Sequence, residues 1–162
     1  MLIRPVSEGD SAEILAIILP VIRAGETYAL ARDMAEADLR DYWLGGNHEV
    51  FVAEEDGCIV GTYFLHANQA GGGGHVANCG YITDAAMSGR GIARAMAVHS
   101  LERARERGFR AMQFNFVVSS NTRAVRLWAS LGFETVGRLP AAFLHPSLGY
   151  VDAFVMFRSL LP

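Results

Sequence analysis

Residues 88–94 have the sequence Ser-Gly-Arg-Gly-Ile-Ala-Arg, at the point where a strand-like run gives way to a helical pattern. Glycine at such a junction lets the backbone approach a ligand closely, and the first N–H groups of the helix point outward without partners. The helix dipole makes this end positive, and Arg90 and Arg94 add charge. The stretch therefore predicts an anion site between a strand and a helix, although a glycine-rich turn that only caps a helix would have a similar sequence.

The spacing of the glycines limits which phosphate ligand this turn suits. A Rossmann-type site needs a third glycine where Arg94 stands and a βαβ unit around it, and the chain has neither. A P-loop needs Gly-Lys followed by Ser or Thr, which does not occur in the sequence. The remaining candidate is a pyrophosphate such as that of coenzyme A.

The hydrophobic periodicity on both sides of the turn predicts a mixed α/β chain. We expect strands over residues 2–6, 48–54, 58–68, 75–83, 110–118, 133–139 and 149–157, and helices up to about residue 19 and over 34–44, 91–107 and 121–131. Ser7 and Asp10 are candidate caps of the first helix, which Pro20 is expected to disturb. Asp56-Gly57 predicts a hairpin, and the four glycines at 71–74 predict a flexible loop tip.

A second motif begins about 30 residues after the glycine turn. Residues 121–133 have the sequence Asn-Thr-Arg-Ala-Val-Arg-Leu-Trp-Ala-Ser-Leu-Gly-Phe, which closely resembles the N-x-x-A-x-x-L-Y-x-x-x-G-F signature of the Gcn5-related N-acetyltransferase (GNAT) family. The glycine turn resembles the other signature of that family, Arg/Gln-x-x-Gly-x-Gly/Ala, through Gly91 and Ala93, whereas Ser88 replaces the Arg or Gln. The resemblance extends over most of the chain.

This resemblance implies the GNAT fold in a single domain, residues 1–162. That fold is a mixed, mostly antiparallel sheet of about seven strands flanked by about four helices, splayed between strands 4 and 5. The resemblance also implies acetyl-CoA as the co-substrate and no metal. The residues expected to bind acetyl-CoA are Ile82, Thr83, Ser88, Gly89, Arg90, Gly91, Ile92, Ala93, Arg94, Asn121 and Trp128.

Trp128 departs from the family pattern, in which a tyrosine is often placed to protonate the leaving thiolate of coenzyme A. An indole N–H donates a hydrogen bond but is not a practical proton donor, so a tyrosine acid at this position is excluded. The coenzyme A thiol has a pKa of about 8 to 9, near that of cysteine, so the thiolate is a tolerable leaving group. Water or a proton from the attacking amine would suffice.

Asn78 and Asn115 fall within the two strands that flank the glycine turn, although asparagine is depleted in strands. A buried amide must be paired, here with a substrate carboxylate or the thioester oxygen. The run from His75 to Tyr81 also resembles fungal acetyltransferases that act on azetidine-2-carboxylate and related proline analogues. That resemblance implies that Asn78 binds the substrate carboxylate with Tyr81 nearby, and that Asn115 orients the substrate or thioester, so Asn115 and Tyr81 are the catalytic candidates. In the structural alternative, both asparagines satisfy a strand bulge near Gly80.

The resulting hypothesis is direct acetyl transfer to the amine of a small molecule, such as an amino acid or analogue, in a ternary complex. Backbone N–H groups near residues 81–83 would stabilise the oxyanion, and proximity would supply much of the rate. Cys79 has no basic neighbour in the sequence that would mark it as a nucleophile. The alternatives are a protein N-terminal or aminoglycoside acetyltransferase, and a catalytically silent coenzyme A-binding module.

The composition of the chain limits which classes of binding partner and which cellular compartment are expected. Of the 162 residues, 51% are hydrophobic and 19% are charged, so the chain is globular, and a net charge of −3 gives no broad basic field for nucleic acid or anionic membranes. The longest apolar run, residues 14–22, is about half of a membrane span, and the N-terminus lacks the pattern of a signal peptide. Two cysteines without metal-ligand spacing indicate reduced core residues, so we expect a cytoplasmic protein. A homodimer is left open by the sequence.

Overall fold

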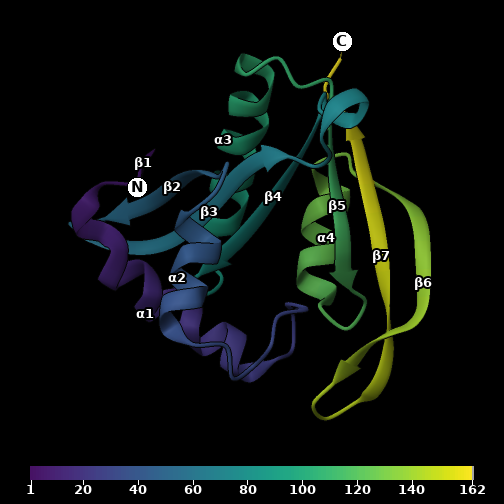
Figure 1. Cartoon of the computed structure of the whole chain (residues 1–162), viewed down its shortest axis with the longest axis horizontal. Coiled ribbons are helices and arrows are strands. Elements are labelled where there is room, and N and C mark those ends of the chain that lie inside the picture. Colours follow the sequence, from purple (N-terminus) through teal and green to yellow (C-terminus); the bar gives the residue numbers. More distant parts are fainter. Residues whose placement is uncertain (162) are drawn as a thin grey trace.

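A computed structural model describes residues 1–161 and contains a seven-stranded sheet with helices on both faces (Figure 1). The strands are β1 (Leu2–Pro5), β2 (Glu49–Glu55), β3 (Cys58–Ala67), β4 (Val76–Thr83), β5 (Ala111–Val118), β6 (Glu134–His145) and β7 (Gly149–Ser159). The helices are α1 (Ser11–Ala24), α2 (Glu36–Leu44), α3 (Ile92–Glu106) and α4 (Thr122–Ser130), and the short 3-10 turns are Glu8–Asp10, Gly71–Gly73 and Ala85–Met87. The predicted GNAT fold is confirmed, since the strand order is β1-β2-β3-β4-β5-β7-β6 and every neighbouring pair is antiparallel except β4–β5.

The sheet opens between β4 and β5, as predicted. Their parallel ladder covers only Val76 with Ala111 and Ala77 with Met112, after which the two strands diverge (Figure 1). On the other side of β4, the pairing with β3 continues to Thr83 without a register shift. No bulge therefore occurs at Gly80 beside Asn78, whereas the β5–β7 ladder shifts register between Phe114 and Val117, next to Asn115.

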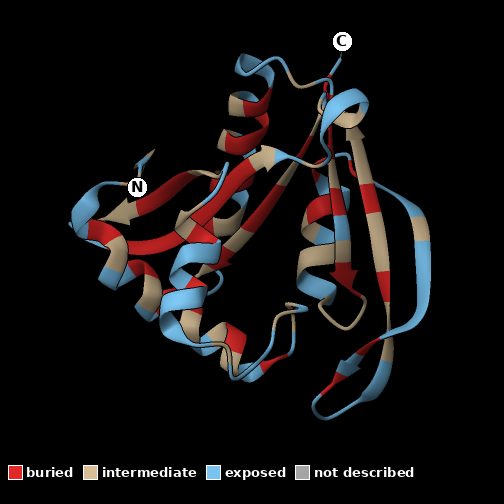
Figure 2. Ribbon diagram, in the orientation of Figure 1, coloured by how far each residue is buried: buried red, intermediate tan, exposed pale blue. Residues whose placement is uncertain are grey.

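Two hydrophobic clusters hold the helices against the two faces of the sheet (Figure 2). The larger cluster packs α3 and α4 against the sheet around the fully buried Met96 and Met112. The smaller one packs α1 and α2 around Ile14, Ile18 and Trp43, which are also fully buried. Because the opening between β4 and β5 lies between these packed layers, its walls are held by both clusters.

The first helix is longer than predicted. It continues through Pro20 to Ala24 instead of ending near residue 19. Proline removes one helical hydrogen bond and costs about 3 kcal/mol in a helix interior, but the helix buries Ile18 and Ile22 on either side of it, and each buried side chain contributes about 1.5–3 kcal/mol. Gly25, at a φ of 68°, then ends the helix in the left-handed conformation.

The sixth strand is also longer than predicted, reaching His145 instead of residue 139. Its pairing with β7 shifts register between Leu139 and Phe143, and Ala141 has a φ of 52°. The Asp152 carboxylate accepts a hydrogen bond from the Ala141 N–H at 2.9 Å. The strand therefore resumes after a bulge that a β7 side chain stabilises, a device that leaves no clear trace in hydrophobic periodicity.

Candidate active site

Backbone groups of β4 face the opening at alternate residues. On the β3 side, the Asp84 N–H donates to the Val60 carbonyl at 2.9 Å. Since successive residues of a strand point their backbone groups in opposite directions, Cys79, Tyr81 and Thr83 point theirs towards β5. The ladder with β5 ends before these residues, so their N–H groups face the opening rather than a neighbouring strand. This is the strand end where the sequence predicts an oxyanion site.

Two backbone carbonyls in the opening are paired by side chains. The Tyr28 hydroxyl donates to the Tyr81 carbonyl at 3.0 Å, and Nδ2 of Asn78 donates to the Gln113 carbonyl at 2.8 Å. In a continued parallel ladder, the Gln113 carbonyl would accept from the Cys79 N–H, so the Asn78 amide replaces a lost strand bond. A buried carbonyl left without a donor would cost about 1–3 kcal/mol.

The glycine turn and α4 enclose a cavity of about 400 Å³. Gly89 and Gly91 have φ values of 84° and 80°, a conformation that favours glycine, and a Cβ built on either would meet no atom within 4 Å. Gly91 is the N-cap of α3, so the first turn of that helix opens into the cavity. The other residues that line it are Tyr81, Thr83, Met87, Ser88, Ile92, Ala93, Arg94, Asn121, Arg123, Ala124, Leu127 and Trp128.

All residues predicted to bind acetyl-CoA line this cavity except Ile82 and Arg90. Ile82 is buried and lines the neighbouring cavity instead. Arg90 forms an ion pair with Glu55 at 3.0 Å, which holds its guanidinium against the β2–β3 hairpin. Arg123, which the sequence reasoning missed, lines the cavity and has no ion pair among the described residues.

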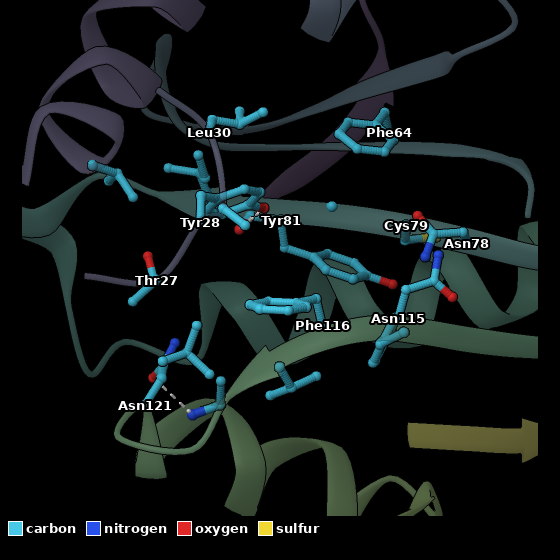
Figure 3. A pocket seen from close by; sticks show the side chains of 18 of the residues that line it. Thr27, Tyr28, Leu30, Phe64, Asn78, Cys79, Tyr81, Asn115, Phe116 and Asn121 are labelled. Atoms are coloured by element: carbon cyan, nitrogen blue, oxygen red, sulfur yellow. Dashed lines mark hydrogen bonds between the residues drawn. The ribbon is translucent and has the colours of Figure 1, made fainter. Parts of the chain in front are cut away.

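Asn121 caps α4 and also faces the opening. Its Oδ1 accepts a hydrogen bond from the Ala124 N–H at 3.2 Å (Figure 3). Its amide nitrogen makes no hydrogen bond within residues 1–161, and the residue lines both cavities. One half of the carboxamide therefore stabilises the helix, while the other half is available to a ligand.

Tyr81 and Trp128 form the wall between the two cavities, and neither offers a ready proton donor. Their ring centroids are 5.0 Å apart, and Trp128 also lies against Phe114 at 4.8 Å. The Tyr81 hydroxyl lies 2.6 Å from Oγ of Ser100 on α3, and burial raises its pKa well above the ordinary value. A catalytic role for Tyr81 therefore rests on its backbone N–H.

The second cavity, of about 410 Å³, lies in the opening between β4 and β5 and extends under the α1–α2 loop (Figure 3). We call it the acceptor cavity and the first one the cofactor cavity. They share Tyr81, Thr83, Asn121, Ala124 and Trp128, so they adjoin across this wall. The remaining residues of the acceptor cavity are Val21, Thr27, Tyr28, Ala29, Leu30, Tyr42, Phe64, Asn78, Cys79, Gly80, Ile82, Phe114, Asn115, Phe116, Val117 and Val118.

Asn78 and Asn115, the predicted substrate and catalytic residues, both line the acceptor cavity from facing strands (Figure 3). Nδ2 of Asn115 donates to Oδ1 of Asn68 at 2.6 Å, and its Oδ1 accepts from Nε2 of Gln113 at 2.8 Å. Asn78 contacts His66 as well as Gln113, with Nε2 of His66 lying 3.2 Å from its Oδ1. The structure thus brings the two asparagines to one cavity and holds each by hydrogen bonds.

The sequence reasoning missed the part of the acceptor cavity formed by Thr27, Tyr28, Leu30, Tyr42 and Phe64. Most of these residues belong to the loop between α1 and α2 or to α2 itself, and they match no motif. The one signal was a tyrosine in a short polar loop, because a large aromatic side chain is seldom left wholly in solvent. It could not have told which strand Tyr28 would contact.

The acceptor cavity carries no charged side chain among the described residues. Its one thiol, Cys79, is buried, and burial raises its pKa to about 12, so it stays protonated at neutral pH. Cys58, the other cysteine, is exposed, and both are free. Within residues 1–161 no group of His, Cys, Asp or Glu side chains is arranged to hold a metal ion.

The strand order, with one short parallel ladder that opens between β4 and β5 beside the start of α3, is the arrangement of the Gcn5-related class of folds. The chain belongs to the acetyltransferase (GNAT) family, whose family model matches residues 19–133. A GCN5-related N-acetyltransferase from Kribbella flavida has a similar structure, with a TM-score of 0.93 and 39% identity over 98% of this chain and 96% of that one. The resemblance drawn from the two sequence motifs is thereby confirmed.

Two curated relatives match part of the chain. The N-acetyltransferase aca1 of Schizosaccharomyces pombe is 32% identical over 98 residues, which are 60% of this chain and 47% of the relative. A mycothiol acetyltransferase of Thermobispora bispora is 35% identical over 86 residues, which are 51% of this chain and 29% of the relative. The matches thus span about half or less of the length of these relatives.

Proposed function

We propose that this protein transfers an acetyl group from acetyl-CoA to the amine of a small molecule, an amino acid or a close analogue, by direct attack in a ternary complex. The observation that carries this proposal is that the cofactor and acceptor cavities adjoin at the β4 strand, where backbone N–H groups face the opening. A thioester bound in the cofactor cavity and an amine bound in the acceptor cavity would meet where the two cavities adjoin. The reaction would then need no covalent enzyme intermediate.

The cofactor cavity offers the groups that a pyrophosphate and a pantetheine arm need. The first N–H groups of α3, together with Arg94 and Arg123, provide positive potential for the phosphates. The free amide of Asn121 provides a donor beside the pantetheine path. In this proposal the N–H groups of Cys79, Tyr81 and Thr83 polarise the thioester carbonyl. Removing one such donor costs about 2.7–4 kcal/mol in well-studied acyl transfers.

Proton transfer would depend on the acceptor amine rather than on a side chain. No carboxylate or imidazole lines the acceptor cavity in the described chain, the Tyr81 hydroxyl is held by Ser100, and the indole N–H of Trp128 is not a practical acid. The amine would therefore enter in its neutral form, and its proton would reach the leaving thiolate directly or through water. We expect kcat/KM to rise with pH until the pKa of the acceptor ammonium is passed, for every acceptor tested.

The chemistry of the acceptor cavity favours a small amino acid over the alternatives. An aminoglycoside carries several ammonium groups, which need carboxylate partners when buried, and the described cavity offers none. A zwitterion carries one carboxylate, which the amides of Asn78 and Asn115 could bind, and a compact body that the surrounding aromatic side chains could enclose. A peptide N-terminus remains the nearest enzyme alternative, and Ser88 and Trp128 keep a silent coenzyme A-binding module open.

Release of free thiol from acetyl-CoA over a panel of amines tests the proposal. The panel should hold azetidine-2-carboxylate, proline, their methyl esters, kanamycin and a short peptide with a free N-terminus. We expect turnover with the free amino acids and a higher KM with the esters, which lack the carboxylate. Turnover restricted to kanamycin or the peptide would contradict the acceptor assignment, and acetyl-CoA binding without turnover on any amine would favour the silent module.

Cytoplasmic location remains a prediction, and a homodimer is left open. Of the helices described here, none combines the length and the apolar character required to span a membrane. Fractionation of cells that express a tagged full chain would test the location, and sedimentation velocity at several concentrations would test the dimer.

A further inference from the structure

The Asn78 carboxamide is held at both of its polar ends. Nδ2 donates to the Gln113 carbonyl at 2.8 Å, and Oδ1 lies 3.2 Å from Nε2 of His66. A carbonyl accepts only from a donor, so the end facing Gln113 must be the NH2 group and the end facing His66 must be the oxygen. It follows that Nε2 of His66 carries a proton and donates it to Asn78.

This arrangement leaves one donor of Asn78 unused. The NH2 group carries two protons, and one of them is taken by Gln113. The second makes no hydrogen bond within the described residues, and Asn78 lines the acceptor cavity. The contact with Gln113 determines which end of the Asn78 carboxamide is the NH2 group, but it still allows the plane of the carboxamide to rotate about that hydrogen bond. A second contact at the oxygen fixes the plane, and with it the direction of the free N–H.

His66 is well placed to supply that second contact. It is the direct cross-strand partner of Asn78 in the β3–β4 ladder, so their side chains lie on the same face. Its ring lies beside the stacked rings of Phe64, at 5.6 Å, and His48, at 4.7 Å, and these contacts limit its rotation. Burial and the neighbouring His48 lower the pKa of His66, so the ring donates its bond without placing a positive charge beside the acceptor amine.

We infer that His66 is a positioning residue for the acceptor: it fixes the plane of the Asn78 carboxamide so that the free N–H of Asn78 is directed at the acceptor carboxylate. His66 does not itself line the acceptor cavity. The inference rests on the proposed function, because it requires that Asn78 contact the acceptor. It adds a residue from β3 to the acceptor site, outside the two sequence motifs.

Steady-state kinetics on four single variants and one double variant test the inference, with azetidine-2-carboxylate and acetyl-CoA as substrates. His66→Leu removes the donor, whereas the amide nitrogen of His66→Gln can reach the place of Nε2. Loss of one neutral hydrogen bond corresponds to a change of about two- to tenfold. We expect His66→Leu to raise the acceptor KM by this factor with kcat and the acetyl-CoA KM unchanged, and His66→Gln to restore it. His48→Phe, which keeps the ring stack but makes no contact with Asn78, is the matched control and should have a normal KM.

The fourth variant, Asn78→Ala, separates failure of this inference from failure of the proposed function. If Asn78→Ala raises the acceptor KM but His66→Leu does not, the positioning role is overturned and the acceptor contact stands. If Asn78→Ala itself leaves the acceptor KM unchanged, the contact and the inference fall together. Should His66→Leu not fold, the comparison of His66→Gln with wild type decides: an acceptor KM raised as far as in Asn78→Ala overturns the inference. In the double variant, His66→Leu should add nothing to the effect of Asn78→Ala, and an additive effect would contradict positioning through Asn78.

Discussion

Replacing Gly80 by alanine tests how closely the acceptor cavity is built around its aromatic wall. A Cβ at Gly80 would lie 2.6 Å from Cε1 and Cζ of Phe64 and 3.2 Å from the Tyr28 hydroxyl. Ordinary contact begins at 3.4 Å, so the Phe64 ring must move by 3.4 − 2.6 = 0.8 Å. The ring is only 3% exposed and packs edge-on against Trp43 at 4.8 Å and flat against His48 at 4.1 Å. Trp43 and His48 therefore block two directions, and the ring can retreat only towards the acceptor cavity that it lines.

The expected loss follows from this overpacking. One methyl group inserted into a packed core costs about 1–3 kcal/mol. At about 2–4 °C per kcal/mol for a chain of this size, the Tm of Gly80→Ala should fall by about 2–12 °C. Tyr28 and Phe64 line only the acceptor cavity, so the acceptor KM should rise while the affinity for acetyl-CoA stays near normal.

Thermal unfolding, acceptor kinetics and calorimetry with acetyl-CoA together measure these effects. Gly137→Ala is the matched control, since Gly137 also lies in a strand and its Cβ would meet Val155 at an ordinary 3.6 Å. The reasoning is refuted if Gly80→Ala has the same Tm and the same acceptor KM as Gly137→Ala. A loss of acetyl-CoA affinity in Gly80→Ala would equally contradict the separation of the two cavities.

Three further predictions concern single residues of the site. Gly91→Glu should abolish acetyl-CoA binding, as calorimetry can measure, because it adds a carboxylate beside the phosphates. The control Gly91→Ala has the same backbone strain at a φ of 80° and should still bind measurably. Equal affinities of the two variants would contradict the phosphate site. Trp128→Tyr should keep kcat within about tenfold, or about 1.4 kcal/mol, because no acid acts at this position, and a hundredfold change would show otherwise. Iodoacetamide at pH 8 should label the exposed Cys58 but not the buried Cys79, because burial raises the pKa of Cys79 to about 12. Mass spectrometry of the folded protein measures the labelling, and rapid labelling of Cys79 would refute its burial.

The cofactor side of the site could be predicted from the sequence because its determinants are local. Gly89 and Gly91 are required by positive φ angles, and Asn121 is required as a helix cap, so each leaves a mark on the sequence within one turn of chain. The ion pair of Arg90 with Glu55 was not predicted, because Glu55 lies on a distant hairpin, and the contact of Arg90 with acetyl-CoA stays a prediction. The local sequence gives the position of a charged residue in the chain, but it does not predict which residue its side chain contacts in the folded protein.

The acceptor side could not be predicted in the same way. The Tyr28 hydroxyl reaches the Tyr81 carbonyl across 53 positions of sequence, and Phe64 enters the cavity only because Gly80 leaves room for its ring. The continuation of α1 through Pro20 has the same origin, since burial of a distant face outweighs a local penalty. These features depend on packing between elements, for which a single sequence provides no pattern.

The opening between β4 and β5 explains why asparagine occurs within a strand at position 78. When a parallel ladder ends inside a sheet, both strands are left with unpaired carbonyl and N–H groups. In this protein, side chains pair two of the carbonyls, through Tyr28 at Tyr81 and through Asn78 at Gln113. The N–H groups of the same stretch of β4 receive no such partner from β5, so the opening presents donors with few competing acceptors. A developing oxyanion requires such an excess of donors. The excess arises because side chains pair the backbone carbonyls at the opening and leave the N–H groups of β4 free, without any charged side chain.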